Sequence, residues 1–326
     1  MYEEFFGLRE APFGLTPNTH FFMQSCSHAQ ALEMLLVGLR TGEGFLKVTG
    51  EVGTGKTLIC RMLLNNIEEE YVTAYIPNPS CSPETLYCLL ADELAGHSEK
   101  TLETHMTHHI DAYFNDSLTN ETQMRALQQI QEKLLELAAQ NQPVALIIDE
   151  AQAMSHETIE ALRLISNLET ESKKLLQIVL FGQPELDERL AQDSLRQLAQ
   201  RISFHHRLTP LSDDAVADYV THRINQAGGN GVQLFSKAAL RSCASASMGV
   251  PRLINMLCHK AMILSYGQGF QTVDQDQMLA AIKDTPICKQ PKFGIKRRSI
   301  SLKWAALLLA LPIGGVWLMQ SSGILL

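Results

Sequence analysis

Short, largely apolar runs alternate with longer segments of helical spacing over the first two thirds of the chain. Five of these runs are rich in β-branched or aromatic residues and predict β-strands at residues 45–49, 71–76, 144–149, 175–181 and 202–208. Between them lie segments with helical spacing, at residues 57–67, 83–95, 122–139 and 158–168. Strands that alternate with helices predict an α/β fold with a parallel, doubly wound sheet of five strands.

After Pro210 the pattern becomes wholly helical. The predicted helices are at about residues 213–227, 236–246, 251–266 and 274–283. Their number and short spacing predict a small all-α domain, which would act as a lid on the first domain.

Residues 50–57, GEVGTGKT, fill the pattern G-x-x-x-x-G-K-[ST] of a phosphate-binding loop. A strand is predicted before the loop and a helix after it, which argues against a chance glycine-rich turn. Lys56 would reach the β- and γ-phosphates of ATP, and the Thr57 hydroxyl would ligate Mg²⁺. The residues expected to contact the nucleotide here are Gly50, Glu51, Val52, Gly53, Thr54, Gly55, Lys56, Thr57 and Leu58.

Asp149 and Glu150 end the third predicted strand. An apolar run that closes in Asp-Glu is the second signature of a nucleotide site. Asp149 would hold Mg²⁺, and Glu150 would polarise the attacking water as a general base. The alternative is an exposed acidic turn.

Three more side chains are candidates for the same site. Gln183 follows the fourth strand and could contact the γ-phosphate or the water, although it could also be a turn residue before a proline. Arg201, together with Arg196, precedes the fifth strand, and we prefer Arg201 as a finger offered to a neighbouring subunit. Arg252 would lie at a helix start and could swing over the nucleotide. A solvated surface position is the alternative for each arginine.

The charge is unevenly distributed. The whole chain carries −8, and residues 289–326 hold six basic residues and no acid, which leaves −14 on residues 1–288. An acidic body argues against a broad nucleic-acid-binding surface. The seven cysteines are scattered, with no C-x-x-C pair, which is typical of reduced thiols in cytoplasm.

The order of these motifs resembles that of the AAA+ ATPases, in which they are called Walker A (50–57), Walker B (147–150), sensor 1 (Gln183), arginine finger (Arg201) and sensor 2 (249–252). The chain is more similar still to the general secretion pathway protein A (ExeA-like) ATPases, a group that includes MSHA pilus biogenesis proteins. The opening stretch MYEEFFGLREAPFGLTPNTHFF, then IIDEAQ, FGQPEL and QRI, carry this resemblance over about residues 1–285. It implies that Pro12 and Phe13 lie in an N-terminal linker near the adenine.

Two segments depart from that resemblance. Residues 98–120 form a polar insertion in which His105, His108 and His109 could bind a metal, although a solvated loop is the better interpretation. The chain ends at Leu326, so we expect no periplasmic peptidoglycan-binding domain. Residues 304–326 are nearly uniformly apolar and follow the basic stretch KRRSISLK. They predict a membrane-spanning helix that leaves the ATPase in the cytoplasm, with a buried or amphipathic helix as the alternative.

The predicted parts are an N-terminal linker and first helix (1–40), an AAA+ nucleotide-binding α/β domain (41–210), a helical lid (211–287), a basic linker (288–303) and a transmembrane helix (304–326). The leading hypothesis is a single-pass ATPase of the bacterial inner membrane, homo-oligomeric through Arg201. It would couple ATP hydrolysis to assembly of a type IV pilus or secretion apparatus, with the assembly proteins as partners. A DNA-associated AAA+ ATPase of the transposition or initiation type and an ATP-gated scaffold remain alternatives.

Overall fold

The computed structural model describes residues 2–23, 26–95, 120–169, 174–229 and 231–288. Residues 1–290 form one compact unit. The predicted basic linker, apart from Cys288, and the predicted transmembrane helix at 304–326 lie outside the described residues. So do residues 98–119, with the three histidines of the insertion. Within the described ranges no helix is both long and apolar enough to cross a membrane.

A five-stranded sheet forms the centre of the first domain. Its strands are β1 (Phe45–Thr49), β2 (Val72–Ile76), β3 (Val144–Ile148), β4 (Gln177–Gly182) and β5 (Ile202–Arg207). Their order is β2-β3-β4-β1-β5 and every pairing is parallel. The parallel sheet predicted from the sequence is therefore confirmed. All five strands carry their carboxyl ends to one edge, where the chain turns into the loops that form the site.

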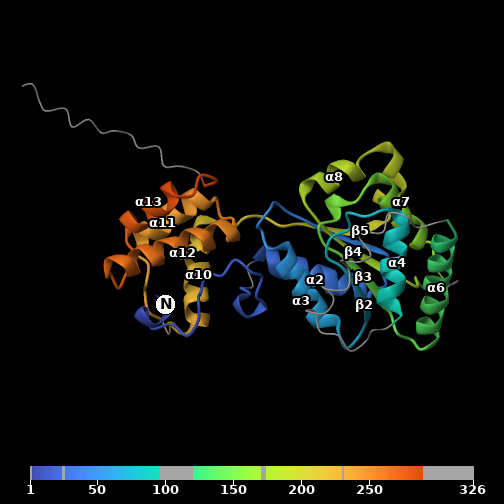
Figure 1. Cartoon of the computed structure of the whole chain (residues 1–326), viewed down its shortest axis with the longest axis horizontal. Helices are drawn as coiled ribbons and strands as arrows, with labels where there is room; N and C mark the ends of the chain where they lie inside the picture. Colours follow the sequence, from blue (N-terminus) through green and yellow to red (C-terminus); the bar gives the residue numbers. More distant parts are fainter. Residues whose placement is uncertain (1, 24–25, 96–119, 170–173, 230, 289–326) are drawn as a thin grey trace, which may run out of the picture. The chain divides into compact units, whose positions relative to one another are not determined.

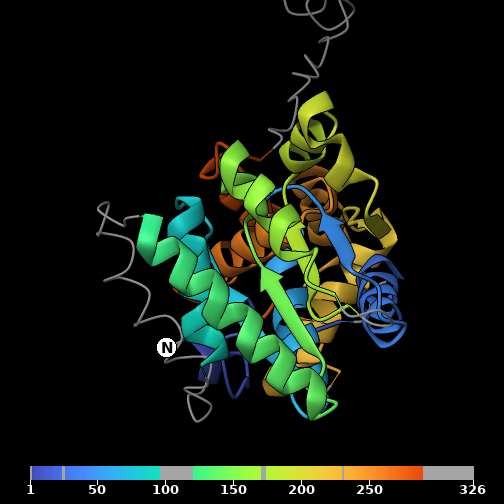
Figure 2. The ribbon, with the colours of Figure 1, turned by 90° about the vertical axis from the view of Figure 1, so that its right-hand side faces the viewer.

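Side-chain alternation along the strands explains why helices cover both faces. Leu46 and Val48 of β1 point to one face, whereas Phe45 points to the other. The first face is covered by α2 (Cys26–Arg40) and α3 (Lys56–Ile67). The second is covered by α4 (Pro83–Leu94), α6 (Asn120–Ala139), α7 (His156–Ile165) and α8 (Pro184–Leu190). Figure 1 shows these two layers, and Figure 2 shows α4 and α6 side by side.

Serine side chains define the starts of four helices. Ser82, Ser155, Ser212 and Ser236 each accept a hydrogen bond from the backbone N–H three residues later, at the first turns of α4, α7, α10 (Asp213–Ile224) and α11 (Lys237–Ser247). Such a cap satisfies a backbone donor that the helix leaves unpaired, and its loss costs about 1 kcal/mol. Local chemistry therefore fixes where these helices begin.

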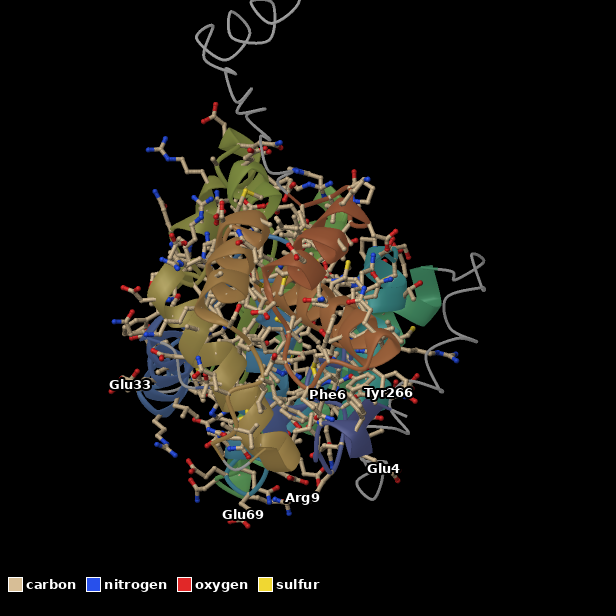
Figure 3. The ribbon with its side chains drawn as sticks, turned by 90° about the vertical axis from the view of Figure 1, so that its left-hand side faces the viewer. Glu4, Phe6, Arg9, Glu33, Glu69 and Tyr266 are labelled. Carbon is tan, nitrogen blue, oxygen red and sulfur yellow. The ribbon has the colours of Figure 1, made fainter. Side chains whose placement is uncertain are left out.

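The lid consists of α10, α11, α12 (Pro251–Gln268) and α13 (Gln275–Lys283), and its core includes aromatic residues from the start of the chain. Helix α1 (Tyr2–Phe5) packs on α12, where the Tyr2 hydroxyl lies 3.0 Å from His259 Nδ1. Phe6 and Phe13 are buried in the same core, and the Phe5 ring lies edge-on to Tyr266 of α12, with their centroids 5.3 Å apart. Figure 3 shows Phe6 and Tyr266 on this side of the molecule. The N-terminal segment is thus held by the lid.

Candidate functional site

The loop between β1 and α3 depends on glycine at two positions. Gly53 has φ +82°, and a Cβ there would lie 2.7 Å from Arg252 Cβ. Gly55 has φ +102°, and a Cβ there would lie 2.8 Å from His28 Nε2. A side chain at either position would be strained and would collide with its neighbour. The loop can therefore approach both the lid and α2, and it ends at the first turn of α3, where unpaired N–H groups favour an anion.

Lys56 lies inside this loop. Its side chain is buried, and its Nζ donates to the carbonyl oxygens of Gly50 at 2.8 Å and Glu51 at 3.1 Å. Burial lowers the pKa of Lys56, and the negative charges of Glu150 and Asp149 partly oppose that effect. The ammonium is thus enclosed by oxygen atoms and close to two carboxylates, which suits a group that binds phosphate oxygens.

Asp149 and Thr57 provide neighbouring oxygen atoms. The Thr57 hydroxyl donates to Asp149 Oδ2 at 2.8 Å, and the Glu150 N–H donates to Asp149 Oδ1 at 2.8 Å. Burial raises the pKa of Asp149, while these two hydrogen bonds lower it. A buried carboxylate beside a hydroxyl is the kind of oxygen pair that Mg²⁺ takes in proteins. The residues at this position therefore fit the metal.

Glu150 adopts a left-handed backbone conformation, with φ +50° and ψ +36°. For a residue with a Cβ this conformation costs of order 1 kcal/mol or more. Glu150 immediately precedes the short helix η2 (Ala151–Ala153), and its conformation turns the chain sharply after β3. Glu150 Oε2 accepts hydrogen bonds from the side-chain amides of Gln152 and Gln183, the latter at 3.3 Å. The two polar residues that follow β3 and β4 therefore meet at one carboxylate oxygen.

A cleft beside the loop is lined by three parts of the chain. They are the N-terminal segment 14–18, the loop with Glu150 and Gln183, and the lid residues Tyr219, Arg223, Pro251, Arg252 and Asn255. Arg252 N donates to Gly53 O at 3.2 Å, so the start of α12 touches the loop. The Arg252 side chain is exposed, packs against Gly53 and lines the cleft.

Arg223 is a cleft residue that the sequence did not reveal. It is buried, its Nε donates to Pro12 O, and its Nη1 donates to the Tyr219 hydroxyl at 2.8 Å. The guanidinium also lies over the Phe21 ring, 4.6 Å from the centroid. Its contacts tie the N-terminal segment to α10. No motif marks this arginine, because its partners lie far away in the chain.

Arg201 lies away from the loop of its own chain. It precedes β5 and its Nη1 donates to the Ser166 hydroxyl at 2.9 Å, whereas the site lies at the carboxyl end of the strands. A six-residue strand such as β5 spans about 20 Å. Arg207, at the other end of β5, is the arginine near the loop, with Nη2 3.8 Å from Glu51 Oε1. Arg201 therefore does not contribute to the nucleotide site of its own chain.

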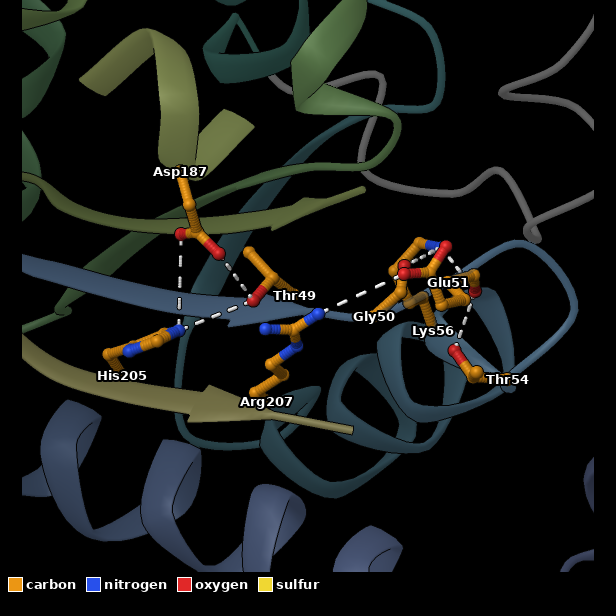
Figure 4. A network of polar contacts seen from close by, with 8 residues as sticks. All are labelled: Thr49, Gly50, Glu51, Thr54, Lys56, Asp187, His205 and Arg207. Carbon is orange, nitrogen blue, oxygen red and sulfur yellow. Dashed lines mark hydrogen bonds and ion pairs between the residues drawn. The ribbon is translucent and has the colours of Figure 1, made fainter. Parts of the chain in front are cut away.

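A polar network holds α8 to the sheet next to the loop (Figure 4). Asp187 of α8 forms an ion pair with the buried Lys47 of β1 and accepts a hydrogen bond from the Thr49 hydroxyl at 3.1 Å. Thr49 Oγ1 also lies 3.2 Å from His205 Nε2 of β5. Burial lowers the pKa of His205, with further lowering by Lys47. Because Gln183 occupies the N-cap position of α8, without a capping hydrogen bond from its side chain, the attachment of α8 to the sheet also positions Gln183.

His28 supports the loop from α2. Its Nε2 lies 2.7 Å from Thr54 O, and since a carbonyl only accepts, Nε2 carries the proton. Burial lowers the pKa of His28, with a smaller lowering effect from His206, while the bond to Thr54 opposes them. The neutral ring is therefore the form that the fold favours.

Comparison with known proteins agrees with this geometry. Residues 39–190 match the AAA domain family. The chain is 40% identical over 283 residues to general secretion pathway protein A of Aeromonas hydrophila, which covers 86% of this chain and 48% of that protein. The chain thus spans about half the length of this relative.

Solved structures share the fold at low sequence identity. Drosophila ORC bound to DNA aligns with a TM-score of 0.60 at 16% identity, covering 86% of this chain and 65% of that chain. Cdc6p of Pyrobaculum aerophilum aligns with a TM-score of 0.57 at 16% identity, covering 82% of this chain and 71% of that chain. Aeropyrum pernix ORC2, in its ADPNP–ADP complexes, aligns with a TM-score of 0.56 at 14% identity, covering 91% of this chain and 76% of that chain. At these identities the likeness concerns the fold alone.

Acidification should test the His28 contact. The unfolded chain binds a proton at the ordinary His pKa of about 6.5, and folded His28 binds it only at lower pH, so stability falls as pH drops below about 6.5. His205 and His206 act in the same direction. We expect His28→Gln, whose amide can still donate to Thr54, to lose less melting temperature between pH 7.5 and 5.5 than the wild type. Equal losses in both proteins would contradict the assignment.

Proposed function

Residues 39–190 match the AAA domain family, and the chain is a P-loop ATPase. From this premise we propose that it couples ATP hydrolysis to the assembly of an envelope machine. The observation that carries the proposal is the 40% identity to general secretion pathway protein A, which extends over 283 residues and so well beyond the AAA domain. The machine would be a type IV pilus or a type II secretion-like apparatus. Within that group we propose, from the sequence resemblance alone, a role like that of the MSHA pilus biogenesis protein MshM.

The proposed roles of the site residues follow from their contacts. Thr57 and Asp149 would hold Mg²⁺, which neutralises phosphate charge when bound. Lys56 would exchange its carbonyl acceptors for phosphate oxygens. Glu150 would take the proton of the attacking water, while Gln183 fixes the orientation of its carboxylate. Arg252, at the start of α12, would contact the nucleotide from the lid.

Two substitutions separate binding from turnover. Lys56→Ala should weaken nucleotide binding because the buried cation is lost. Glu150→Gln should bind ATP normally and reduce phosphate release by about 10²-fold or more, since the loop is intact and the base is absent. Glu188→Gln, an exposed acid on α8, is the matched control. Unchanged phosphate release by Glu150→Gln protein would refute the role of Glu150.

The same variants test the biological role in the source bacterium. A strain without this chain should lose its surface pili or its secreted proteins, and wild-type protein should restore them. Glu150→Gln protein should not restore them if hydrolysis drives assembly. Full restoration by the turnover-deficient variant would favour the ATP-gated scaffold. A loss of DNA transposition or initiation with normal pili and secretion would favour the DNA-associated alternative.

The position of Arg201 supports a homo-oligomer. Arg201 cannot reach its own loop, and a phosphate-binding site benefits from a cation that neutralises charge on the γ-phosphate. We therefore assign Arg201 to the site of a neighbouring copy.

Mixing two inactive variants tests this assignment. Arg201→Ala should lower turnover by on the order of 10³-fold with little change in ATP affinity. Arg201→Ala mixed with Lys56→Ala should regain activity, because one variant supplies the loop and the other the arginine. Arg196→Ala, another exposed arginine nearby, is the control. A mixture that assembles but stays inactive would exclude Arg201 as the finger.

Residues 304–326 would anchor the chain in the bacterial inner membrane as a single span, with the ATPase in the cytoplasm. This part of the proposal rests on the apolar run and its basic flank.

Extraction of membranes tests the anchor. Full-length protein should stay with membranes in alkaline carbonate, whereas protein truncated after Arg298 should be released, because only the apolar run holds it there. Release of the full-length protein would rule out a spanning segment.

A further inference from the structure

A continuous set of hydrogen bonds joins the phosphate-binding loop to Glu150 through Gln152, to which the nucleotide-binding motifs give no role. The Gly50 N–H donates to Gly182 O at 3.1 Å. The N–H of Gln183, the first residue after β4, donates to Gln152 Oε1 at 2.9 Å. The Gln152 side-chain amide then donates to Glu150 Oε2. One backbone peptide and one side-chain amide therefore connect the two nucleotide motifs.

The turn that carries Gln152 packs against β4 and α8. A Cβ at Gly182 would lie 2.7 Å from Leu186 Cδ2, so α8 packs closely on this end of β4, and it would lie 3.5 Å from Gln152 Oε1, within ordinary contact distance of the amide. Ala151 and Met154, on either side of Gln152 in the turn, are fully buried. Arg189 of α8 donates to Met154 O and so holds the turn against α8. The backbone that carries Gln152 is thus fixed at both ends.

We propose that Gln152 is a positioning residue for ATP hydrolysis, which holds the Glu150 carboxylate in register with the phosphate-binding loop. The inference rests on the proposed role of Glu150 as the base. A glutamate side chain has three rotatable bonds, and Glu150 itself lies in a left-handed backbone conformation, so the direction of its carboxylate needs an external donor. The Gln152 side-chain nitrogen is that donor, and the Gln152 Oε1 atom accepts a hydrogen bond from the Gln183 N–H, which holds the amide in place.

These hydrogen bonds would also transmit movement of the phosphate-binding loop to Glu150. A shift of the loop at Gly50 would move the Gly182–Gln183 peptide, because the same peptide accepts from Gly50 and donates to Gln152. Gln183 contributes a second amide to the same oxygen of Glu150. Loop geometry is therefore communicated to the base by hydrogen bonds rather than by contact between the two.

A double-mutant cycle on the full-length protein tests the proposal. Gln152→Ala removes both the donor and the acceptor, and should lower kcat by about 10- to 100-fold while KM and ATP affinity stay the same. Gln152→Glu, which keeps the size but cannot donate as a carboxylate, should behave alike. In the Glu150→Gln background, Gln152→Ala should cause no further loss, since the group that it positions is already absent. Gln177→Ala is the control, because Gln177 is a buried amide of β4 that bonds to Leu39 O and Glu43 O at the other end of the sheet.

The outcomes are distinct. Unchanged kcat in Gln152→Ala, a parallel loss of ATP affinity, or an equal loss in the Glu150→Gln background would each overturn the positioning role. So would a loss of kcat in Gln177→Ala as large as that in Gln152→Ala. If Glu150→Gln alone keeps full turnover, the proposed base is wrong and the positioning role fails with it. If Glu150→Gln is inactive and Gln152→Ala is not, only the positioning role fails.

Discussion

The parallel pairing of β1 with β4 is the constraint on which the site depends. It places Thr49 opposite Gly182, and the chain continues from one into the phosphate-binding loop and from the other into Gln183. Strand β3 pairs with the other side of β4 and delivers Asp149 and Glu150 to the same edge. A slip of one residue would turn every side chain of a strand to the opposite face, so burial of both faces fixes this register. The register of the sheet thus sets the positions of the two nucleotide motifs relative to each other.

Features that depend on neighbouring residues could be predicted from the sequence. The loop 50–57 has a required spacing, and the strands are marked by apolar runs whose ends agree with the structure to within about two residues. Strand β4 begins at Gln177 although the apolar run begins at Leu175. Leu175 and Leu176 are buried but precede the strand, because an apolar run reports burial and not strand pairing.

Features that depend on distant partners could not be predicted in this way. Arg223 contacts Pro12, and His28 contacts Thr54, and in each case the partner is a backbone carbonyl, which carries no sequence signal. Gln152 lies inside the stretch IIDEAQ, yet its contact with the Gln183 N–H depends on β4 lying beside β3. The N-terminal aromatic residues similarly required the lid core to explain why the segment beside the cleft stays in place.

The ion pair between Lys47 and Asp187 limits which substitutions these two positions can accept during evolution. Lys47 is a charged residue in a buried strand, and its ammonium is neutralised by one carboxylate from α8. Replacement of Asp187 alone would leave a buried positive charge, and replacement of Lys47 alone would leave a carboxylate without its ammonium partner. Intermediates with a single change are therefore disfavoured, whereas an apolar pair of similar volume would be tolerated. These two positions, 140 residues apart in the chain, should exchange together among descendants of this protein.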